Sequence, residues 1–143
     1  MIYELTSTLE LHQIIEMART VITAPVEILR KRVIAAITHP DSKIFIDRGK
    51  ANEIRGFIFG TIEELDGDEC VFIHLCVVKP EGHHLQEKRM ERQLTLELVA
   101  KIESWARERG IKIMYFMTRR NPDAFKRKFK FELDYYLMKR EVK

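Results

Sequence analysis

The residues that decide the fold are 69–110, ECVFIHLCVVKPEGHHLQEKRMERQLTLELVAKIESWARERG. The first part of this segment, Glu69 to Val78, is rich in β-branched and aromatic residues and predicts a buried strand, which Pro80 ends. Apolar residues then recur along one helical stripe until Gly110 stops the helix. The stripe consists of Met90, Leu94, Leu98, Ile102 and Trp105. We therefore predict a strand and a long helix, a pair that normally leads to a parallel neighbouring strand.

Upstream of this segment, the sequence predicts a strand, two amphipathic helices and an antiparallel meander. The strand runs from Ile2 to Thr6, and a hydroxyl at Ser7 or Thr8 can cap the next helix by accepting a first-turn amide. A second helix starts at Pro25 and ends before Pro40. Three β-rich runs, separated by turn residues, form the meander at residues 43–47, 54–65 and 69–78.

Downstream, the pattern predicts a strand, a short helix and a last strand. Residues 111–117 (IKIMYFM) form the first of these, Pro122 opens a helix that ends near Phe129, and residues 131–142 form the closing strand. The order β-α-α-β-β-β-α-β-α-β indicates a mixed α/β fold. Because 143 residues are enough for one core, and no repeat or linker interrupts them, we expect a single domain over residues 1–143.

Composition argues against several classes of protein. The chain is 45% hydrophobic and 33% charged, it has no run of roughly 18 apolar residues, and its N-terminus lacks a signal-peptide pattern. We therefore expect a cytoplasmic protein that does not enter a membrane. Cys70 and Cys76 are too few for a disulfide framework and lack clustered zinc ligands. The adjacent His83 and His84 point to different sides of any regular element, so we expect no metal site.

Positive charge is concentrated near the C-terminus. The net charge is +3, but residues 119–143 contain nine Lys or Arg against four Asp or Glu. An anionic partner, either a nucleic acid or an acidic protein, can dock on the segment from Arg119 to Lys130. The alternative is that this charge run forms the solvated face of a short helix. The oligomeric state is also open, with a homodimer as one alternative.

Three passages resemble the GNAT (Gcn5-related N-acetyltransferase) superfamily. Residues 55–60 (RGFIFG) are similar to the central hairpin strand of that family, and residues 73–81 (IHLCVVKPE) resemble the strand and turn that lead to its acetyl-CoA loop. Residues 98–125 resemble the helix, strand and Asn-containing turn that follow. The resemblance implies a mixed central sheet of six to seven strands flanked by about four helices. It also implies an acetyl-CoA-dependent N-acyltransferase that acts on an unidentified amine.

The sequence departs from the family at the acetyl-CoA loop. GNAT enzymes place two glycines at the start of the long helix, so that backbone amides can approach the pyrophosphate closely. In this register the glycine positions hold Gln93 and Thr95. The stretch from Pro80 to Thr95 is also longer than usual. Either the loop has grown, or the helix begins about two turns earlier, near His84 or Gln86.

Two functional outcomes follow from this departure. In the first, the segment rearranges and still binds coenzyme A, with basic side chains replacing part of the glycine cradle. The cofactor-binding candidates are then Val77, Val78, Lys79, Gly82, Arg89, Arg92, Gln93, Thr95 and Asn121. In the second, the site is degenerate, and the fold serves as a catalytically inactive binding or structural module that uses its basic C-terminal segment to contact a nucleic acid or an acidic partner.

His74 is the candidate general base of the first outcome. An unperturbed histidine titrates near pH 6.5, so it can deprotonate an amine near neutral pH. By strand alternation we expect it to share a sheet face with Phe72, Cys76 and Val78, opposite to the set Ile73, Leu75 and Val77. The alternative is a histidine that is simply satisfied within an apolar strand. By resemblance, the backbone amide of Val78 would polarise the thioester carbonyl.

The family often protonates the departing thiolate with a tyrosine on the short helix. Here that helix, PDAFKRKFKF, contains no tyrosine. Tyr115, Tyr135 or Tyr136 can substitute from a strand, although tyrosines in strands are usually packing residues.

Overall fold

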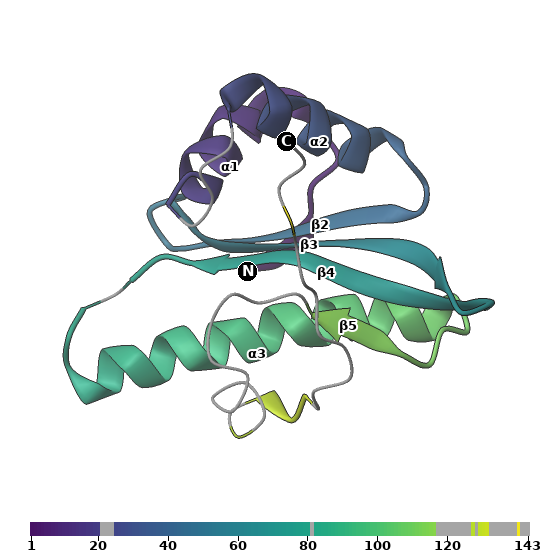
Figure 1. Ribbon diagram of the computed structural model, residues 1–143. Coiled ribbons are helices and arrows are strands. Elements are labelled where there is room, and N and C mark those ends of the chain that lie inside the picture. The colour runs from purple at the N-terminus through teal and green to yellow at the C-terminus, as the bar shows by residue number, and fades with distance from the viewer. Residues whose placement is uncertain (21–24, 81, 117–126, 128, 132–139, 141–143) are drawn as a thin grey trace.

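A computed structural model describes residues 1–20, 25–80, 82–116, 127, 129–131 and 140. These residues form three layers, with a mixed sheet between two helices on one face and one long helix on the other (Figure 1). The strands are β1 Ile2–Glu4, β2 Ser42–Arg48, β3 Ile54–Leu65, β4 Asp68–Val78 and β5 Met114–Phe116. The helices are a 3₁₀ turn, Thr8–Glu10, and α1 Leu11–Ala18, α2 Val26–Thr38 and α3 Leu85–Glu108.

The sheet has the order β1-β2-β3-β4-β5. Strands β1 to β4 pair antiparallel, and β5 pairs parallel to β4 after the crossover through α3. This confirms the predicted mixed α/β fold, with its meander and parallel return. The described part of the chain has five strands and three α-helices, fewer than the six to seven strands and four helices predicted. The predicted last strand and most of the short helix after Pro122 lie outside the described residues.

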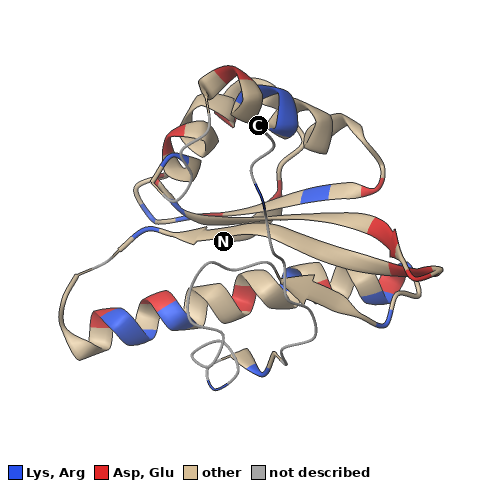
Figure 2. Cartoon of the chain, in the orientation of Figure 1, with Lys and Arg blue, Asp and Glu red and all other residues tan. Residues whose placement is uncertain are grey.

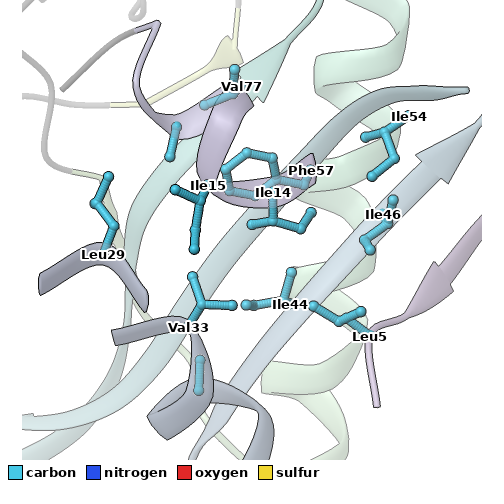
Figure 3. Packing of buried hydrophobic residues seen from close by; sticks show 12 residues of the cluster. Leu5, Ile14, Ile15, Leu29, Val33, Ile44, Ile46, Ile54, Phe57 and Val77 are labelled. Atoms are coloured by element: carbon cyan, nitrogen blue, oxygen red, sulfur yellow. The ribbon is translucent and has the colours of Figure 1, made fainter. Parts of the chain in front are cut away.

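Strand alternation divides the apolar residues between two cores. In β2, Ile44 and Ile46 face α1 and α2, whereas Phe45 faces α3. Figure 3 shows the first core, in which Ile14 and Phe57 are almost completely buried. The members of this α1/α2 core are Leu5, Ile14, Ile15, Ala18, Leu29, Val33, Ala36, Ile44, Ile46, Ile54, Phe57 and Val77.

Helix α3 covers the opposite face from Leu94 onward. Its buried side chains are Leu94, Leu98, Ile102, Trp105 and Ala106. Leu98 and Ile102 are fully inaccessible to solvent, and each such burial contributes roughly 1.5–3 kcal/mol. Met90 was predicted to belong to this stripe, but 44% of it is exposed. The buried stripe begins at Leu94, and Figure 1 shows that the first turns of α3 lie beyond the ends of the strands.

A β-bulge in β4 changes which side chains face each core. Phe59 pairs with Leu75, but the next residue of β3, Gly60, pairs with Ile73, so His74 is the extra residue. Before the bulge, Ile73 packs against α3; after it, Leu75 packs against the α1/α2 core. The expected alternation through this strand was therefore wrong. Its members Cys76 and Val78 lie on the α3 face, not on the face of His74.

Candidate active site

His74 lies on the α1/α2 face of the sheet, between side chains of β3 and β4. Its ring stacks on Phe59, with ring centroids 5.1 Å apart, and on Phe72, at 6.3 Å. Its Nε2 atom lies 2.6 Å from Oγ1 of Thr61. The bulge places His74 diagonally opposite both Phe59 and Thr61, which are two residues apart on the same face of β3. The imidazole is thus held on three sides and remains partly accessible.

The surroundings of His74 favour the neutral imidazole. Burial lowers its pKa below the ordinary value of 6.5, and the charge of Arg32 on α2 lowers the pKa further. The carboxylate of Glu63 acts in the opposite direction and raises the pKa. Its effect is smaller than that of burial and larger than that of Arg32. The net result is a histidine that is uncharged at pH 7 and can accept a proton.

The candidates at the end of β4 occupy three different environments. Val77 is buried against α1 and α2, Val78 packs against the α3 face, and the side chain of Lys79 is exposed. The amide of Lys79 donates to the carbonyl of Arg55 on β3, at 2.8 Å. Because successive amides of a strand point in opposite directions, the N–H of Val78 points away from β3, toward the β5 side of β4.

Helix α3 begins early, at Leu85, rather than after an enlarged loop. A capping box closes its N-terminus. The His84 side chain accepts from the backbone of Glu87, and the Glu87 carboxylate accepts from the His84 amide at 3.1 Å. Gly82 lies beside this box at φ 157°, where an added β-carbon would collide with the Glu87 carboxylate. His84 is thus a helix cap, a role that its position three residues before a glutamate could have indicated.

Four cofactor-binding candidates lie within α3. Arg89 and Arg92 are exposed one turn apart, and Figure 2 shows the basic residues of the first half of α3 in blue. Gln93 and Thr95, at the positions of the family glycines, lie in the helix interior, where backbone amides make intrahelical hydrogen bonds. Any contact from these two residues to a phosphate would therefore come from the side chains. Those side chains already contact their own helix: Gln93 Nε2 donates to Glu97 at 3.2 Å, and Thr95 Oγ1 donates to the carbonyl of Glu91 at 3.0 Å.

Several predicted residues are placed elsewhere or are not described. Asn121 and most of the segment from Arg119 to Lys130 lie outside the described residues, as do Tyr135 and Tyr136. Tyr115 stacks on Phe72 with ring centroids 5.3 Å apart. This contact is consistent with a packing residue.

Sequence reasoning missed three neighbours of His74, namely Thr61, Glu63 and Arg32. The spacing of Phe59, Thr61 and Glu63 puts their side chains on one face of β3, and this alternation is readable in the sequence. What the sequence does not reveal is the bulge that brings His74 opposite them.

A separate cavity of about 630 Å³ lies on the other face of the sheet, between α3 and the ends of β1, β2 and β3. Its lining includes Asp47, which is almost fully buried, and Arg55. Asp47 accepts from the terminal amine of Met1 at 3.0 Å and lies 3.6 Å from the Arg55 guanidinium. Asp47 thus pairs with two of the positive groups of this cavity, and the cavity lies on the face of the sheet opposite to His74.

Other kinds of site are not evident in the described ranges. No group of three His, Cys, Asp or Glu side chains there is arranged to hold a metal ion. Neither Cys70 nor Cys76 forms a disulfide within those ranges, and burial, with a smaller effect of Glu63, raises the pKa of Cys70. No helix within those ranges is both long enough and apolar enough to cross a bilayer.

No protein-family model matches the sequence, and no curated protein matches it significantly. Solved structures do match, over nearly the full chain. AAC(6')-Ih, an aminoglycoside 6'-N-acetyltransferase from Acinetobacter baumannii, is 13% identical with a TM-score of 0.79, covering 100% of this chain and 99% of its own. Glucosamine-6-phosphate N-acetyltransferase from Arabidopsis thaliana is 14% identical with a TM-score of 0.74, covering 100% and 98%. This chain has the GNAT fold.

A third GNAT structure, aminoglycoside N-acetyltransferase AAC(6')-Iy in complex with CoA, is 14% identical with a TM-score of 0.78 and covers 99% of this chain and 93% of its own. The GNAT resemblance seen in residues 55–60, 73–81 and 98–125 is thereby confirmed for the fold, and the similar structures are N-acetyltransferases.

Proposed function

We propose that the chain is an acetyl-CoA-dependent N-acyltransferase that acylates an amine, with His74 as its general base. The observation that carries the proposal is a neutral, partly buried imidazole at a bulge of β4, the strand that leads into α3 in this GNAT fold. Bulges are over-represented beside active sites, where they redirect a side chain.

The base is needed because an amine attacks only in its neutral form. An aliphatic ammonium keeps its proton at pH 7, so a group that is unprotonated at this pH must accept that proton in the site. His74 is uncharged at this pH, and its ring is only partly buried. Among the described candidates it is the one that combines both properties.

The end of β4 fits the acyl end of the cofactor. Acetyl-CoA, when bound, supplies an acyl group activated as a thioester. The N–H of Val78, which points to the β5 side, is a donor suited to a carbonyl oxygen that gains negative charge. Val77 packs into the α1/α2 core and Val78 against the α3 face, so this donor is anchored on both faces of the sheet.

The phosphate end of the cofactor would be held by side chains rather than by helix amides. His84 and Glu87 already occupy the capping positions at the start of α3. Arg89 and Arg92 present exposed guanidinium groups on the following turns, and such groups form strong charge-assisted hydrogen bonds with phosphates. We assign supporting contacts to the remaining candidates, Lys79, Gly82, Gln93, Thr95 and Asn121.

Thermal melting with acetyl-CoA tests the proposal. At a ligand concentration 100-fold above the dissociation constant, binding would stabilise the fold by about 2.7 kcal/mol, which raises the melting temperature by several degrees. The double variant Arg89→Gln/Arg92→Gln should lose most of this shift. The control Arg107→Gln, an exposed arginine at the other end of α3, should keep it. A melting temperature unaffected by millimolar acetyl-CoA would refute the proposal.

Activity is measured as free thiol released from acetyl-CoA in the presence of spermidine, glucosamine or a lysine peptide. Release that requires one of these amines identifies an acceptor class.

A further inference from the structure

Three side chains form a continuous line on the α1/α2 face of the sheet. Thr61 Oγ1 lies 2.9 Å from Oε1 of Glu63 and 2.6 Å from Nε2 of His74. Two of them come from β3 at alternate positions, and the third is the bulged residue of β4. The Thr61 hydroxyl is therefore a bridge between a carboxylate and an imidazole.

The direction of each hydrogen bond in this line follows from the chemistry of the groups. A threonine hydroxyl has one hydrogen, and an ionised carboxylate can only accept. The Thr61 hydroxyl donates its hydrogen to Oε1 of Glu63, an exposed side chain. The oxygen of Thr61 then faces Nε2 with a lone pair, which requires a hydrogen on Nε2. A neutral imidazole carries only one N–H, so Nδ1 is left as the unprotonated nitrogen.

We propose that Thr61 and Glu63 are positioning residues that fix His74 in its Nε2–H tautomer and leave Nδ1 as the atom that accepts the proton of the amine. The role of Nδ1 in catalysis depends on the proposed acyltransferase function, whereas the tautomer depends only on the three side chains. This division of roles resembles that of a catalytic triad, in which the third group orients the base rather than taking the proton.

The proton transfer leaves the line of hydrogen bonds intact. One proton moves from the ammonium group of the acceptor to Nδ1 of His74, which becomes an imidazolium, and the amine keeps the freed electron pair. The Nε2–H continues to donate to Thr61, and the carboxylate of Glu63 stabilises the new positive charge through the bridge. The imidazolium returns its proton to solvent after the transfer.

Two charged groups act on His74 from different elements. Glu63, on β3, raises its pKa, and Arg32, on α2, lowers it. Neutralising them one at a time should therefore move the titration midpoint in opposite directions. Glu63→Gln keeps an acceptor for the Thr61 hydrogen and should lower the pKa of His74, whereas Arg32→Gln should raise it. Glu64→Gln, a neighbouring exposed carboxylate outside the line, is the matched control and should move it least.

The tautomer can be measured without any activity. In protein labelled with ¹⁵N-histidine, long-range ¹H–¹⁵N correlation spectra distinguish a protonated from an unprotonated ring nitrogen, and the His74→Gln variant identifies the His74 signals. We expect Nε2 to be protonated and Nδ1 unprotonated above the pKa of His74. Thr61→Ser should preserve this state because it keeps the hydroxyl, whereas the isosteric Thr61→Val should lose it. Circular dichroism and melting show whether each variant is folded.

Kinetics supply a second readout. Thr61→Val should lower kcat roughly tenfold or more, toward the ~100-fold loss expected when the base itself is removed, and should leave the KM for acetyl-CoA unchanged. Thr61→Ser should restore most of kcat. A wild-type Nδ1–H tautomer, or a tautomer unchanged in folded Thr61→Val, overturns this inference regardless of activity. The expected tautomer in a protein that does not bind acetyl-CoA overturns the proposed function and leaves the positioning of His74 by Thr61 and Glu63 supported.

Discussion

His74 and Leu75 are consecutive residues of one strand, yet both side chains lie on the same face of the sheet. His74 stacks on Phe59, and Leu75 packs against the same α1/α2 core to which Phe59 contributes. The bulge that causes this also shifts the alternation of side chains, so that each residue beyond it lies on the face opposite to the one expected without the bulge. One extra residue therefore determines both the position of the proposed base and the sheet face on which each later side chain of β4 lies.

Replacing the proposed base should abolish most of the activity but not cofactor binding. We expect His74→Gln to lower kcat by about 100-fold or more, the typical contribution of a positioned base. The dissociation constant of coenzyme A, measured by calorimetry, should not change, because no phosphate contact is assigned to this residue. The control is His12→Gln, an exposed histidine of α1. An unchanged turnover rate in His74→Gln would eliminate this assignment.

Stability should depend on pH through the same residue. The pKa of His74 is lowered in the folded chain, so between that value and 6.5 the unfolded chain binds more protons than the folded one. The free energy of unfolding should therefore fall as the pH decreases through 6.5, and this contribution should level off below the folded pKa. Urea titrations of the wild type and His74→Gln between pH 7.5 and 5 measure it. If both proteins lose the same stability over that range, His74 is not responsible.

Close packing of β3 against its neighbours should make Gly56 less tolerant of substitution than Gly60. A β-carbon at Gly56 would lie 2.9 Å from the carbonyl oxygen of Val77 and 3.3 Å from a methyl group of Leu94. We expect Gly56→Ala to cost about 1–3 kcal/mol, as overpacking usually does. At Gly60 the nearest atom, 3.2 Å away, is the flexible end of Ile102, so Gly60→Ala should cost less. Chemical denaturation that ranks the two variants in the reverse order would contradict this packing.

Only part of helix α3 should contribute to the free energy of unfolding. Leu98 is fully buried, and its truncation to alanine should cost roughly 2–5 kcal/mol. Leu85, in the first turn, is 66% exposed, and Leu85→Ala should change the free energy of unfolding by less than about 0.5 kcal/mol. Equal losses for the two variants would mean that the first turns of α3 are packed against the rest of the protein.

The sequence allowed the strands and helices to be predicted because their local signals agree with the tertiary fold. The predicted β3 run of residues 54–65 coincides with the observed strand, and the alternative in which α3 starts near His84 is the one found. The face of each β4 residue was not predictable in the same way. A bulge arises from the pairing of two strands, and neither strand encodes it alone. The bridge from Glu63 through Thr61 to His74 depends on that pairing and was missed for the same reason.

The capped, solvent-exposed start of α3 can vary in sequence and length more freely than the rest of the helix. Residues 85–93 contribute no side chain to either core, while Leu94 begins the buried stripe. The stretch between Lys79 and Leu94 can therefore be replaced by another segment without changing either core. A shorter, glycine-bearing loop could be grafted there while every buried contact of the sheet is kept. In this scaffold, affinity for a phosphorylated cofactor can be gained or lost by evolution or by engineering with little effect on folding.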